Sequence, residues 1–400
     1  MKKLALVVPS LADGGGVTAV ARFVKDAALQ SGRYEVKLVS LSVASRDAVS
    51  RLATMPSTWR TGPIVRQGEW EGMPFVHVGA DWGEFEFQRY MPRPILNDVL
   101  SDCDVVQVVC GSPAWANAVV GAGKPVALQV ATRAVVERRQ RDGAAKDLRG
   151  LWRRAMTRIT DKLDDRALKR VDAIQVENLW MLEYSQNINE GRSLDLRYAP
   201  PGIDASLFTP LSARDIDTRP YILCVGRLND PRKNIGLLLE AYARLPRATI
   251  DRVPLVLAGS SGPGEAFWLR AEILRVAGRV QYIERPSRAA LVKLYQQASL
   301  FALSSDEEGL GVVILEAMGC GVPVVSTKSG GPDGIIQDGV DGFLVSLGDA
   351  AAMSQRMATL LQDKSLNLEI GRRAREVVEA RYDEVVAGKE FVNTWDSLVL

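Results

Sequence analysis

The chain has 400 residues, 47% of them hydrophobic, which is too long for one ordinary core and enough to bury two cores of similar size. Its formal net charge of only +2 excludes strong overall basicity, so we expect no nucleic-acid partner. The four cysteines are scattered without metal-ligand spacing, which excludes a zinc site of the usual kind and suits a reducing cytoplasm.

The first half of the chain alternates apolar runs with helical patterns. The opening run in MKKLALVVPSLADGGG is short and is followed by Asp13 and three glycines, so we expect a first strand and not a signal peptide. No apolar stretch reaches about 18 residues, so we expect no membrane-spanning helix. Strands are predicted at 4–9, 36–41, 75–78, 105–109, 126–130 and 173–176.

The second half repeats this alternation after a non-helical linker at 198–210, where three prolines and Gly202 stand in YAPPGIDASLFTP. Strands are predicted at 221–225, 255–258, 281–283, 300–303, 322–326 and 342–345. Alternation of this kind is typical of α/β domains with doubly wound parallel sheets. We therefore predict one domain at 1–198 and a second at 199–380, followed by a helical segment at 381–400.

The stretch SSDEEGLGVVILEAMGCGVPVVS at 304–326 places two carboxylates near one another. Glu308 is expected in a loop, and Glu316 eight positions later on a helix whose apolar face carries Ile314, Leu315 and Met318. Eight mostly helical steps separate them by on the order of 10 Å. Ionised carboxylates accept hydrogen bonds from vicinal hydroxyls, so the pair suits the two diols of a nucleotide sugar. The alternative is that Glu316 only faces water.

Two cations stand near the first strand of the second half. Arg227 follows Gly226 at the predicted strand end, and Lys233 comes six positions later, where a helix begins after Asp230 and Pro231. Open α/β sheets bind ligands at such strand ends, and a helix amino terminus favours an anion. Arg227 and Lys233 therefore suit a diphosphate and are our candidate catalytic residues together with Glu308. The alternative is that both are solvated surface residues.

The spacing from Glu308 to Glu316, the segments GCGVPVVS and GGPDGIIQDGVDGFLV after it, and VGRLNDPRKN at 225–234 resemble family 4 of the retaining glycosyltransferases, within glycosyltransferase group 1. The resemblance covers most of residues 200–400, and in residues 1–200 only the layout and the opening Gly-rich loop. It implies the GT-B fold, in which two Rossmann-like domains face a central cleft. It also implies that the helix at 381–400 crosses back to the N-terminal domain.

The resemblance also implies further donor-binding positions. The loop at 13–16 lacks a GxGxxG dinucleotide fingerprint, and by resemblance Gly15 and Gly16 approach the donor phosphate or sugar, although a plain turn remains the alternative. By the same resemblance, the base, phosphate and sugar pocket is lined by Gly226, Gly259, Glu284, Arg285, Gly309, Leu310, Gly311 and Glu316. Gly330 and Gly331 follow another strand and either meet the donor sugar beside Glu308 or only form a turn.

The sequence departs from the family pattern in its first half. Family members commonly carry a histidine after the strand that here reads LQVATR, and often another in the strand that reads DVVQVV. The matching positions hold Ala131 or Thr132, and Gln107. The single histidine, His77, lies in an alternating strand-like run and is interpreted as a partly buried structural residue.

Residues 133–170 form a local basic region. Within it Trp152, Met156, Ile159 and Leu163 recur at helical spacing, which predicts a basic amphipathic helix. Such a helix can lie on an anionic membrane or dock a lipid-linked phosphate acceptor. It can equally pack its apolar stripe on the core, and Asp161, Asp164 and Asp165 dilute its charge.

The sequence thus predicts a retaining, metal-independent hexosyltransferase with no cofactor. Its donor is expected to be a nucleoside diphosphate sugar, and its acceptor a carbohydrate or lipid-linked molecule of cell-surface polysaccharide or glycoconjugate synthesis. We expect it in the cytoplasm, with peripheral association at the membrane face as an option. Two alternatives remain: a GT-B epimerase of the nucleotide sugar, and a catalytically silent nucleotide-sugar-binding partner of another transferase.

Overall fold

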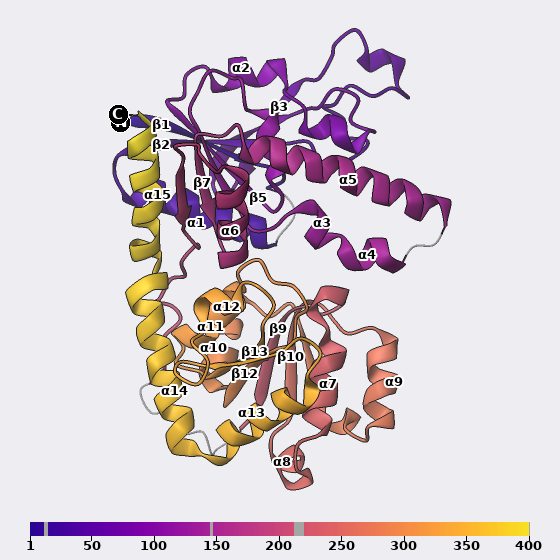
Figure 1. The fold of residues 1–400 in the computed structure, drawn as a ribbon, viewed down its shortest axis with the longest axis vertical. Helices are drawn as coiled ribbons and strands as arrows, with labels where there is room; N and C mark the ends of the chain where they lie inside the picture. The colour runs from indigo at the N-terminus through magenta and orange to yellow at the C-terminus, as the bar shows by residue number, and fades with distance from the viewer. Residues whose placement is uncertain (12–14, 145–146, 212–219, 400) are drawn as a thin grey trace. The chain divides into compact units, whose positions relative to one another are not determined.

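The computed structural model describes residues 1–11, 15–144, 147–211 and 220–399. The chain divides into two compact units. Unit 1 comprises Met1–Pro201 and the returning segment Ala387–Leu400, and unit 2 comprises Gly202–Val386. The two Rossmann-like α/β domains predicted from the sequence are therefore present, each with its own sheet (Figure 1).

Unit 1 is built on an eight-stranded sheet with the order β3-β4-β2-β1-β5-β6-β7-β8. Its strands are β1 (Lys2–Val8), β2 (Tyr34–Leu41), β3 (Val65–Trp70), β4 (Met73–Val78), β5 (Val105–Cys110), β6 (Val126–Val130), β7 (Ala173–Val176) and β8 (Asp195–Tyr198). All six strands predicted for this half are present. Neighbouring strands run parallel, as the predicted doubly wound sheet requires, except for β3.

Two strands of unit 1, β3 and β8, were not predicted from the sequence. β3 pairs antiparallel with β4 through a turn at Glu71 and Gly72, so the sheet is not wholly parallel. β3 lies at the sheet edge and is largely exposed, and it lacks the apolar run by which buried strands were recognised. β8 lies at the opposite edge of the sheet. Its four residues are half-buried and likewise form no continuous apolar run.

The helices of unit 1 are α1 (Gly16–Gln30), α2 (Pro94–Leu100), α3 (Ala134–Glu137), α4 (Arg139–Ala144), α5 (Leu148–Leu168) and α6 (Leu179–Ile188), with short 3-10 turns at Pro56–Thr58, Glu86–Tyr90 and Pro113–Ala118. Both faces of the sheet bury apolar side chains. Alternate residues of β5 show this, because Val106 and Val108 belong to one core cluster and Val105 and Val109 to the other. Burial on both faces explains why these strands read as continuous apolar runs.

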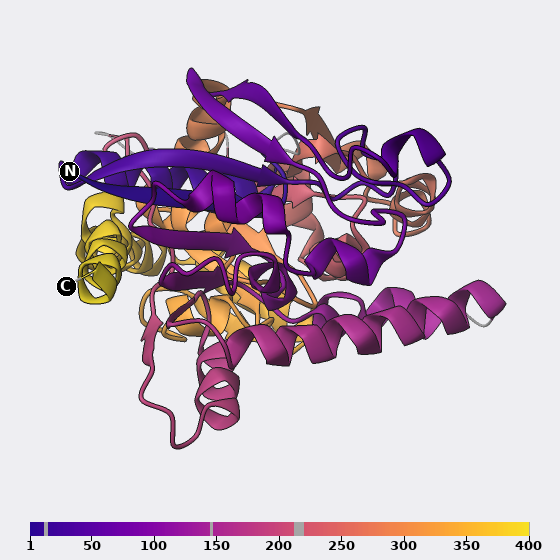
Figure 2. The ribbon, with the colours of Figure 1, turned by 90° about the horizontal axis from the view of Figure 1, so that it is seen from above.

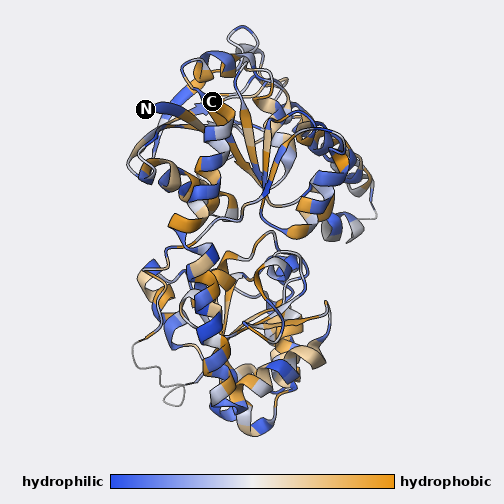
Figure 3. Ribbon diagram, turned by 60° about the vertical axis from the view of Figure 1, so that its left-hand side comes forward, coloured by the Kyte–Doolittle hydropathy of each residue, from blue (hydrophilic) through white to orange (hydrophobic). Residues whose placement is uncertain are grey.

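Unit 2 is built on a six-stranded parallel sheet with the order β11-β10-β9-β12-β13-β14. Its strands are β9 (Ile222–Arg227), β10 (Leu255–Ser261), β11 (Val280–Glu284), β12 (Leu300–Leu303), β13 (Val324–Thr327) and β14 (Phe343–Val345). Each matches a predicted strand to within three residues. The apolar strands form the interior of each unit, and polar residues are concentrated on the helices around them (Figure 3).

The helices of unit 2 are α7 (Ile235–Ala243), α8 (Arg247–Arg252), α9 (Glu265–Ile273), α10 (Arg288–Gln297), α11 (Val312–Gly319), α12 (Pro332–Ile335), α13 (Ala350–Gln362) and α14 (Lys364–Val377), with short turns at Pro231–Lys233, Ala277–Arg279 and Val378–Tyr382. The predicted linker at 198–210 contains no helix. Because β10, β9 and β12 are parallel neighbours, the loops that follow them lie next to one another at the carboxyl end of the sheet.

The last helix, α15 (Glu384–Val399), returns the chain to unit 1. Phe391 packs edge-on against Phe23 of α1, and Trp395 packs edge-on against Tyr34 of β2. The indole N–H of Trp395 donates to Gln107 Oε1 at 2.7 Å, and both side chains are fully buried. A buried indole needs such an acceptor, so Gln107 fixes the position of α15 on the sheet.

Candidate functional site

The candidate site of unit 2 lies at the carboxyl ends of its parallel strands. β9 ends at Gly226 and Arg227, and the chain then turns so that Asp230 N–H donates to Arg227 O at 3.0 Å. The Asp230 carboxylate accepts from the backbone N–H of Arg232 at 3.1 Å and caps the short turn Pro231–Lys233. This cap sets the position from which Lys233 points back toward β9.

The structure brings two of the predicted catalytic residues into contact. Lys233 Nζ lies 2.6 Å from Glu308 Oε1, and Ser305 Oγ donates to the same carboxylate oxygen at 2.6 Å. The side chains of Lys233 and Glu308 are 17% and 10% exposed, so their ion pair is screened less than one on an open surface. The second oxygen of Glu308 belongs to neither bond and is the one suited to a ligand hydroxyl.

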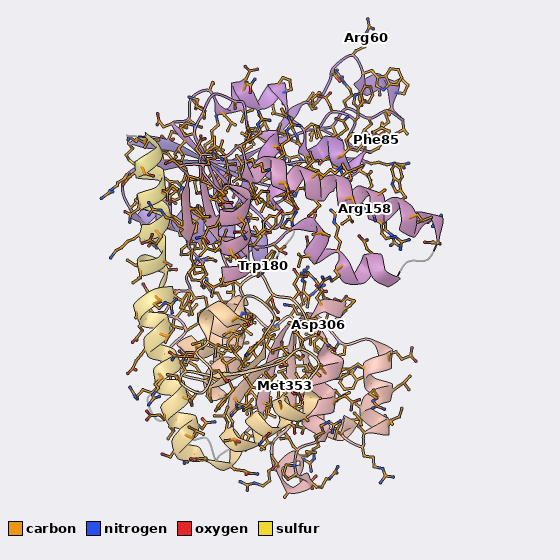
Figure 4. The ribbon with its side chains drawn as sticks, viewed as in Figure 1. Arg60, Phe85, Arg158, Trp180, Asp306 and Met353 are labelled. Atoms are coloured by element: carbon orange, nitrogen blue, oxygen red, sulfur yellow. The ribbon has the colours of Figure 1, made fainter. Side chains whose placement is uncertain are left out.

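A second layer of polar residues ties the loop after β12 to the turn before α7. Ser304 Oγ donates to the carbonyls of Lys233 and Asn234, at 3.0 Å each. Asn234 has φ +41°, caps α7, and donates its amide to Asp306 Oδ1 at 2.8 Å. Asp306 is labelled in Figure 4 in the loop that follows β12. These contacts fix Lys233 and Glu308 relative to each other.

Sequence reasoning missed Ser304, Ser305, Asn234 and Asp306. The polar run SSDE directly after a buried strand, and the asparagine after RK before an apolar helical pattern, were the available signals. They are weak signals because serine and asparagine are common in loops of every kind.

The loop of Glu308 is also held by the segment after β13. Glu308 N–H donates to Ser329 O at 2.8 Å, and Gly331 N–H donates to Glu308 O at 3.0 Å. A Cβ at Gly331 would lie 2.3 Å from Leu310 O, so this approach excludes any side chain. Leu310 is 3% exposed and packs in the core, which leaves only its backbone for the predicted ligand contact. Gly309 and Gly311 flank it, and Gly311 caps α11 with φ +87°.

Arg227 is 55% exposed and lies 3.4 Å from Asp230 Oδ2, whereas Arg232 pairs with the same oxygen at 2.8 Å. Burial raises the pKa of Asp230, but the hydrogen bonds and charge of Arg232 outweigh it and hold the pKa below its usual value. Asp230 therefore stays ionised and orients two guanidinium groups. Arg227 is the more exposed of the two and can reach an incoming anion.

Glu316 lies on α11, whose Ile314, Leu315 and Met318 are fully buried, as the apolar spacing predicted. Glu316 Oε2 accepts from the hydroxyl of Tyr295, on α10, at 2.7 Å. Burial raises the pKa of Glu316 to about 7, although Tyr295 and the charge of Arg288 favour the ionised form. A carboxyl with a raised pKa keeps its proton to a higher pH than a free one, and when protonated it can donate a hydrogen bond as well as accept one.

Gly259, Glu284 and Arg285 lie together at the ends of β10 and β11. A Cβ at Gly259 would lie 1.8 Å from Gly226 O, so the two strand ends touch through bare backbone. The carbonyl of Gly259 accepts from Arg285 N–H at 2.8 Å and from the Tyr282 hydroxyl at 3.0 Å. The side chains of Glu284 and Arg285 are 68% and 75% exposed, so both are free of the core and face solvent.

The candidates in the first half belong to unit 1. Asp13 and Gly14 lie outside the described residues, whereas Gly15 precedes α1 and Gly16 begins it, both exposed. His77 lies 3.1 Å from Ser40 Oγ and 2.8 Å from Asp47 Oδ2 and is 15% exposed, which agrees with the structural role predicted for it. Gln107 holds Trp395, so it is not available to replace a ligand-binding histidine.

In the part of the chain that the structure describes, no helix is long and apolar enough to cross a bilayer. Within the same residues, no group of three or more histidine, cysteine, aspartate or glutamate side chains is placed to hold a metal ion.

Comparison with known proteins finds sequence similarity that is concentrated in unit 2. Residues 212–377 match the family model described as glycosyl transferases group 1. Over 183 residues the chain is 34% identical to the lipopolysaccharide core biosynthesis glycosyltransferase LpsE of Rhizobium meliloti, covering 44% of this chain and 48% of that protein. Over 189 residues it is 34% identical to the GDP-mannose-dependent alpha-(1-6)-phosphatidylinositol monomannoside mannosyltransferase of Mycolicibacterium smegmatis, covering 43% and 49%. The aligned parts thus span about half the length of these two curated relatives.

Among solved structures, the chain is similar to HepE of Anabaena, crystallised with UDP and glucose, with a TM-score of 0.71 and 18% sequence identity over 100% of both chains. At that identity the similarity concerns the fold alone. It extends through unit 1, which the sequence comparisons leave largely uncovered.

Proposed function

We propose that this chain is a retaining, metal-independent glycosyltransferase that moves a hexose from a nucleoside diphosphate sugar to an acceptor. The match of residues 212–377 to the model of glycosyl transferases group 1 supports the proposal. The observation that carries the proposal is the Lys233–Glu308 pair at the carboxyl end of the unit 2 sheet, beside Arg227. An ammonium group and a guanidinium group suit a diphosphate, while a neighbouring carboxylate suits sugar hydroxyls.

In this proposal Arg227 and Lys233 stabilise the negative charge that develops on the diphosphate as the sugar leaves. Fixed donors directed at developing charge are a large source of catalysis, and they perform the electrostatic task for which other enzymes use a divalent cation. Donor binding would exchange part of the contact between Lys233 and Glu308 for contacts with phosphate and sugar. The second oxygen of Glu308 would then accept from the hexose, while Ser305 keeps the carboxylate in place.

Glu316 would bind the ribose end of the donor. Its carboxyl keeps the Tyr295 bond on Oε2, so the ligand meets the other oxygen. With a pKa of about 7, the carboxyl can accept from one ribose hydroxyl when ionised and can donate when protonated. Gly259, Glu284 and Arg285 at the neighbouring strand ends would line the base and the phosphates.

For retention we propose that the leaving phosphate takes the proton of the acceptor hydroxyl, so that no separate basic side chain is required. The acceptor would be a carbohydrate or a lipid-linked molecule of cell-surface polysaccharide or glycolipid synthesis, as the names of LpsE and the phosphatidylinositol monomannoside mannosyltransferase suggest. We propose a cytoplasmic location, where nucleotide sugars are available.

A binding-only role is the second candidate, and one observation favours it. Gln107 occupies a position where family members often carry histidine, and it is fully buried and bound to Trp395. A partner of another transferase would keep the donor site without this histidine.

Product analysis by mass spectrometry, together with chromatography that resolves isomeric nucleotide sugars, separates these possibilities. The whole chain would be incubated with a panel of UDP- and GDP-hexoses and with lipid-linked and free saccharide acceptors. Transfer predicts a glycosylated acceptor and the nucleoside diphosphate, and epimerisation predicts an isomeric nucleotide sugar with no diphosphate released. Nucleotide-sugar binding without any product would reject the enzymatic proposal in favour of the binding-only role.

A further inference from the structure

Helix α5 of unit 1 distributes its apolar residues over two faces. The sequence grouped Trp152, Met156, Ile159 and Leu163 into one stripe, and the structure shows that this grouping is wrong. Met156 and Leu163 are each 8% exposed, whereas Trp152 is 61% and Ile159 39% exposed. Met156 and Leu163 are covered by the rest of unit 1, whereas Trp152 and Ile159 are open to solvent. Leu151, which is 54% exposed, joins the outward set.

Basic residues lie on the same outward face. We call the outward surface of α5 the set of exposed residues that comprises Arg149, Leu151, Trp152, Arg158, Ile159, Lys162 and Arg166. At 3.6 residues per turn, five of these residues project within an arc of about 100°, namely Leu151, Trp152, Ile159, Lys162 and Arg166. Arg158 and Arg149 flank this arc on its two sides. Lys169 and Arg170, also exposed, extend the positive charge beyond the end of α5. Arg158 is labelled on this helix in Figure 4.

The acidic residues of α5, by contrast, are either buried or paired with a cation. Asp164 is fully buried and accepts from Ser112 Oγ and from the backbone N–H groups of Ala114 and Ala134, the latter two at 2.8 Å. Asp161 and Asp165 lie 2.8 and 2.9 Å from Arg133 Nη2. Among the α5 side chains that the structure describes, none of the exposed ones is acidic. Asp164 is thus withdrawn from the surface, and the charges of Asp161 and Asp165 are in part balanced by Arg133.

We propose that the outward surface of α5 binds an anionic lipid bilayer. With 21 residues the helix is about 30 Å long and can lie in the plane of the interface. Its amino-terminal end projects from the body of unit 1 in Figures 1 and 2, so this end is accessible to a flat surface. Trp152 and Leu151 insert at the level of the headgroups, and the lysine and arginine side chains meet the lipid phosphates.

The combination of groups favours a bilayer over a nucleic acid. Exposed leucine and isoleucine gain nothing from a phosphodiester backbone, whereas the interface between headgroups and acyl chains accepts them together with an indole. The proposal concerns unit 1 alone and does not depend on the donor site of unit 2. Its failure therefore leaves the proposed function standing, and the reverse also holds.

Vesicle flotation tests the proposal with the whole chain. Vesicles of phosphatidylcholine are compared with vesicles containing about 30% phosphatidylglycerol, and binding should be at least about tenfold stronger to the anionic set. The double variant Arg158→Gln/Lys162→Gln removes two exposed charges from α5 while keeping good helix formers. At about fivefold per basic residue near the surface, it should bind the anionic vesicles about 25-fold more weakly.

The matched control is Arg252→Gln/Lys293→Gln, which removes two exposed charges from unit 2 and should bind within about twofold of the wild type. Trp152→Ser should weaken binding to both vesicle types, and circular dichroism confirms that each variant is folded. Equal binding to neutral and anionic vesicles would overturn the proposal. So would an equal loss in the control, or binding to a DNA or RNA duplex without binding to vesicles.

Discussion

The replacement Glu316→Gln should make the protein more stable, and increasingly so as pH rises. Burial raises the pKa of Glu316 from 4.5 to about 7, so ionising this group disfavours the folded state. At about 1.36 kcal/mol per pKa unit, the full shift corresponds to about 3 kcal/mol. Because the pKa of Glu316 is higher in the folded than in the unfolded chain, the protonated carboxyl favours folding. This contribution to the free energy of unfolding is complete below the pKa of the unfolded chain and is lost as pH rises through the pKa of the folded chain. Glutamine carries no charge, and its carbonyl still accepts from Tyr295.

Urea unfolding at a series of pH values measures the effect. The free energy of unfolding of the variant minus that of the wild type should grow by about 2 kcal/mol between about pH 5.5 and about pH 8. The variant must be compared with the wild type at each pH, because burial also raises the pKa of Glu177 in unit 1 to about 7. Glu177 therefore changes the free energy of unfolding of both proteins with pH in the same way. Glu284→Gln, at a carboxyl that is 68% exposed, controls for the loss of a negative charge as such. A difference for Glu316→Gln that stays constant with pH would refute the reasoning.

Three further replacements test other parts of the structure. Arg227→Ala and Lys233→Ala should each lower transfer by about 10²- to 10³-fold in a product assay with the fold retained, and activity within about threefold of wild type for both would reject their assignment. Gln107→Leu should lower the free energy of unfolding by about 1–3 kcal/mol in urea, because it leaves the buried indole N–H of Trp395 without an acceptor, and unchanged stability would show that this bond does not hold α15 in place.

The strands that line the core could be predicted from the sequence because helices cover both faces of each sheet. Burial on both sides leaves continuous apolar runs such as Val105–Cys110, and these carry their own signal. The edge strands Val65–Trp70 and Asp195–Tyr198 have one open side and no such run. Their pairing depends on neighbours distant in the sequence, which a local pattern does not contain.

The candidate site could be predicted in its charged residues and not in its supporting contacts. Arg227, Lys233 and Glu308 stand in recognisable motifs, and the structure joins Lys233 to Glu308 across a separation of 75 residues. Ser304 and Asn234 act through hydrogen bonds that exist only once β9 and β12 lie side by side. The raised pKa of Glu316 could not be predicted from the sequence either, because it comes from burial in the folded unit.

Burial also decided the interpretation of α5. The one-dimensional pattern placed four apolar residues at helical spacing and three aspartates among them, and both observations were correct. Only the fold shows that Asp164 is buried while Trp152 is exposed, because elements elsewhere in the sequence cover one side of the helix.

The central claim is that the strand ends of unit 2 bind the diphosphate of a nucleotide sugar, and isothermal titration calorimetry tests it most directly. UDP and GDP would be titrated into the wild type, into Lys233→Ala, and into the control Arg252→Ala, whose residue is exposed at the end of α8. The account predicts that one nucleotide binds wild type and control alike, and that Lys233→Ala binds it at least about tenfold more weakly, as the loss of a charge-assisted hydrogen bond implies. Equal affinity of all three proteins, or no binding of either nucleotide, would contradict it.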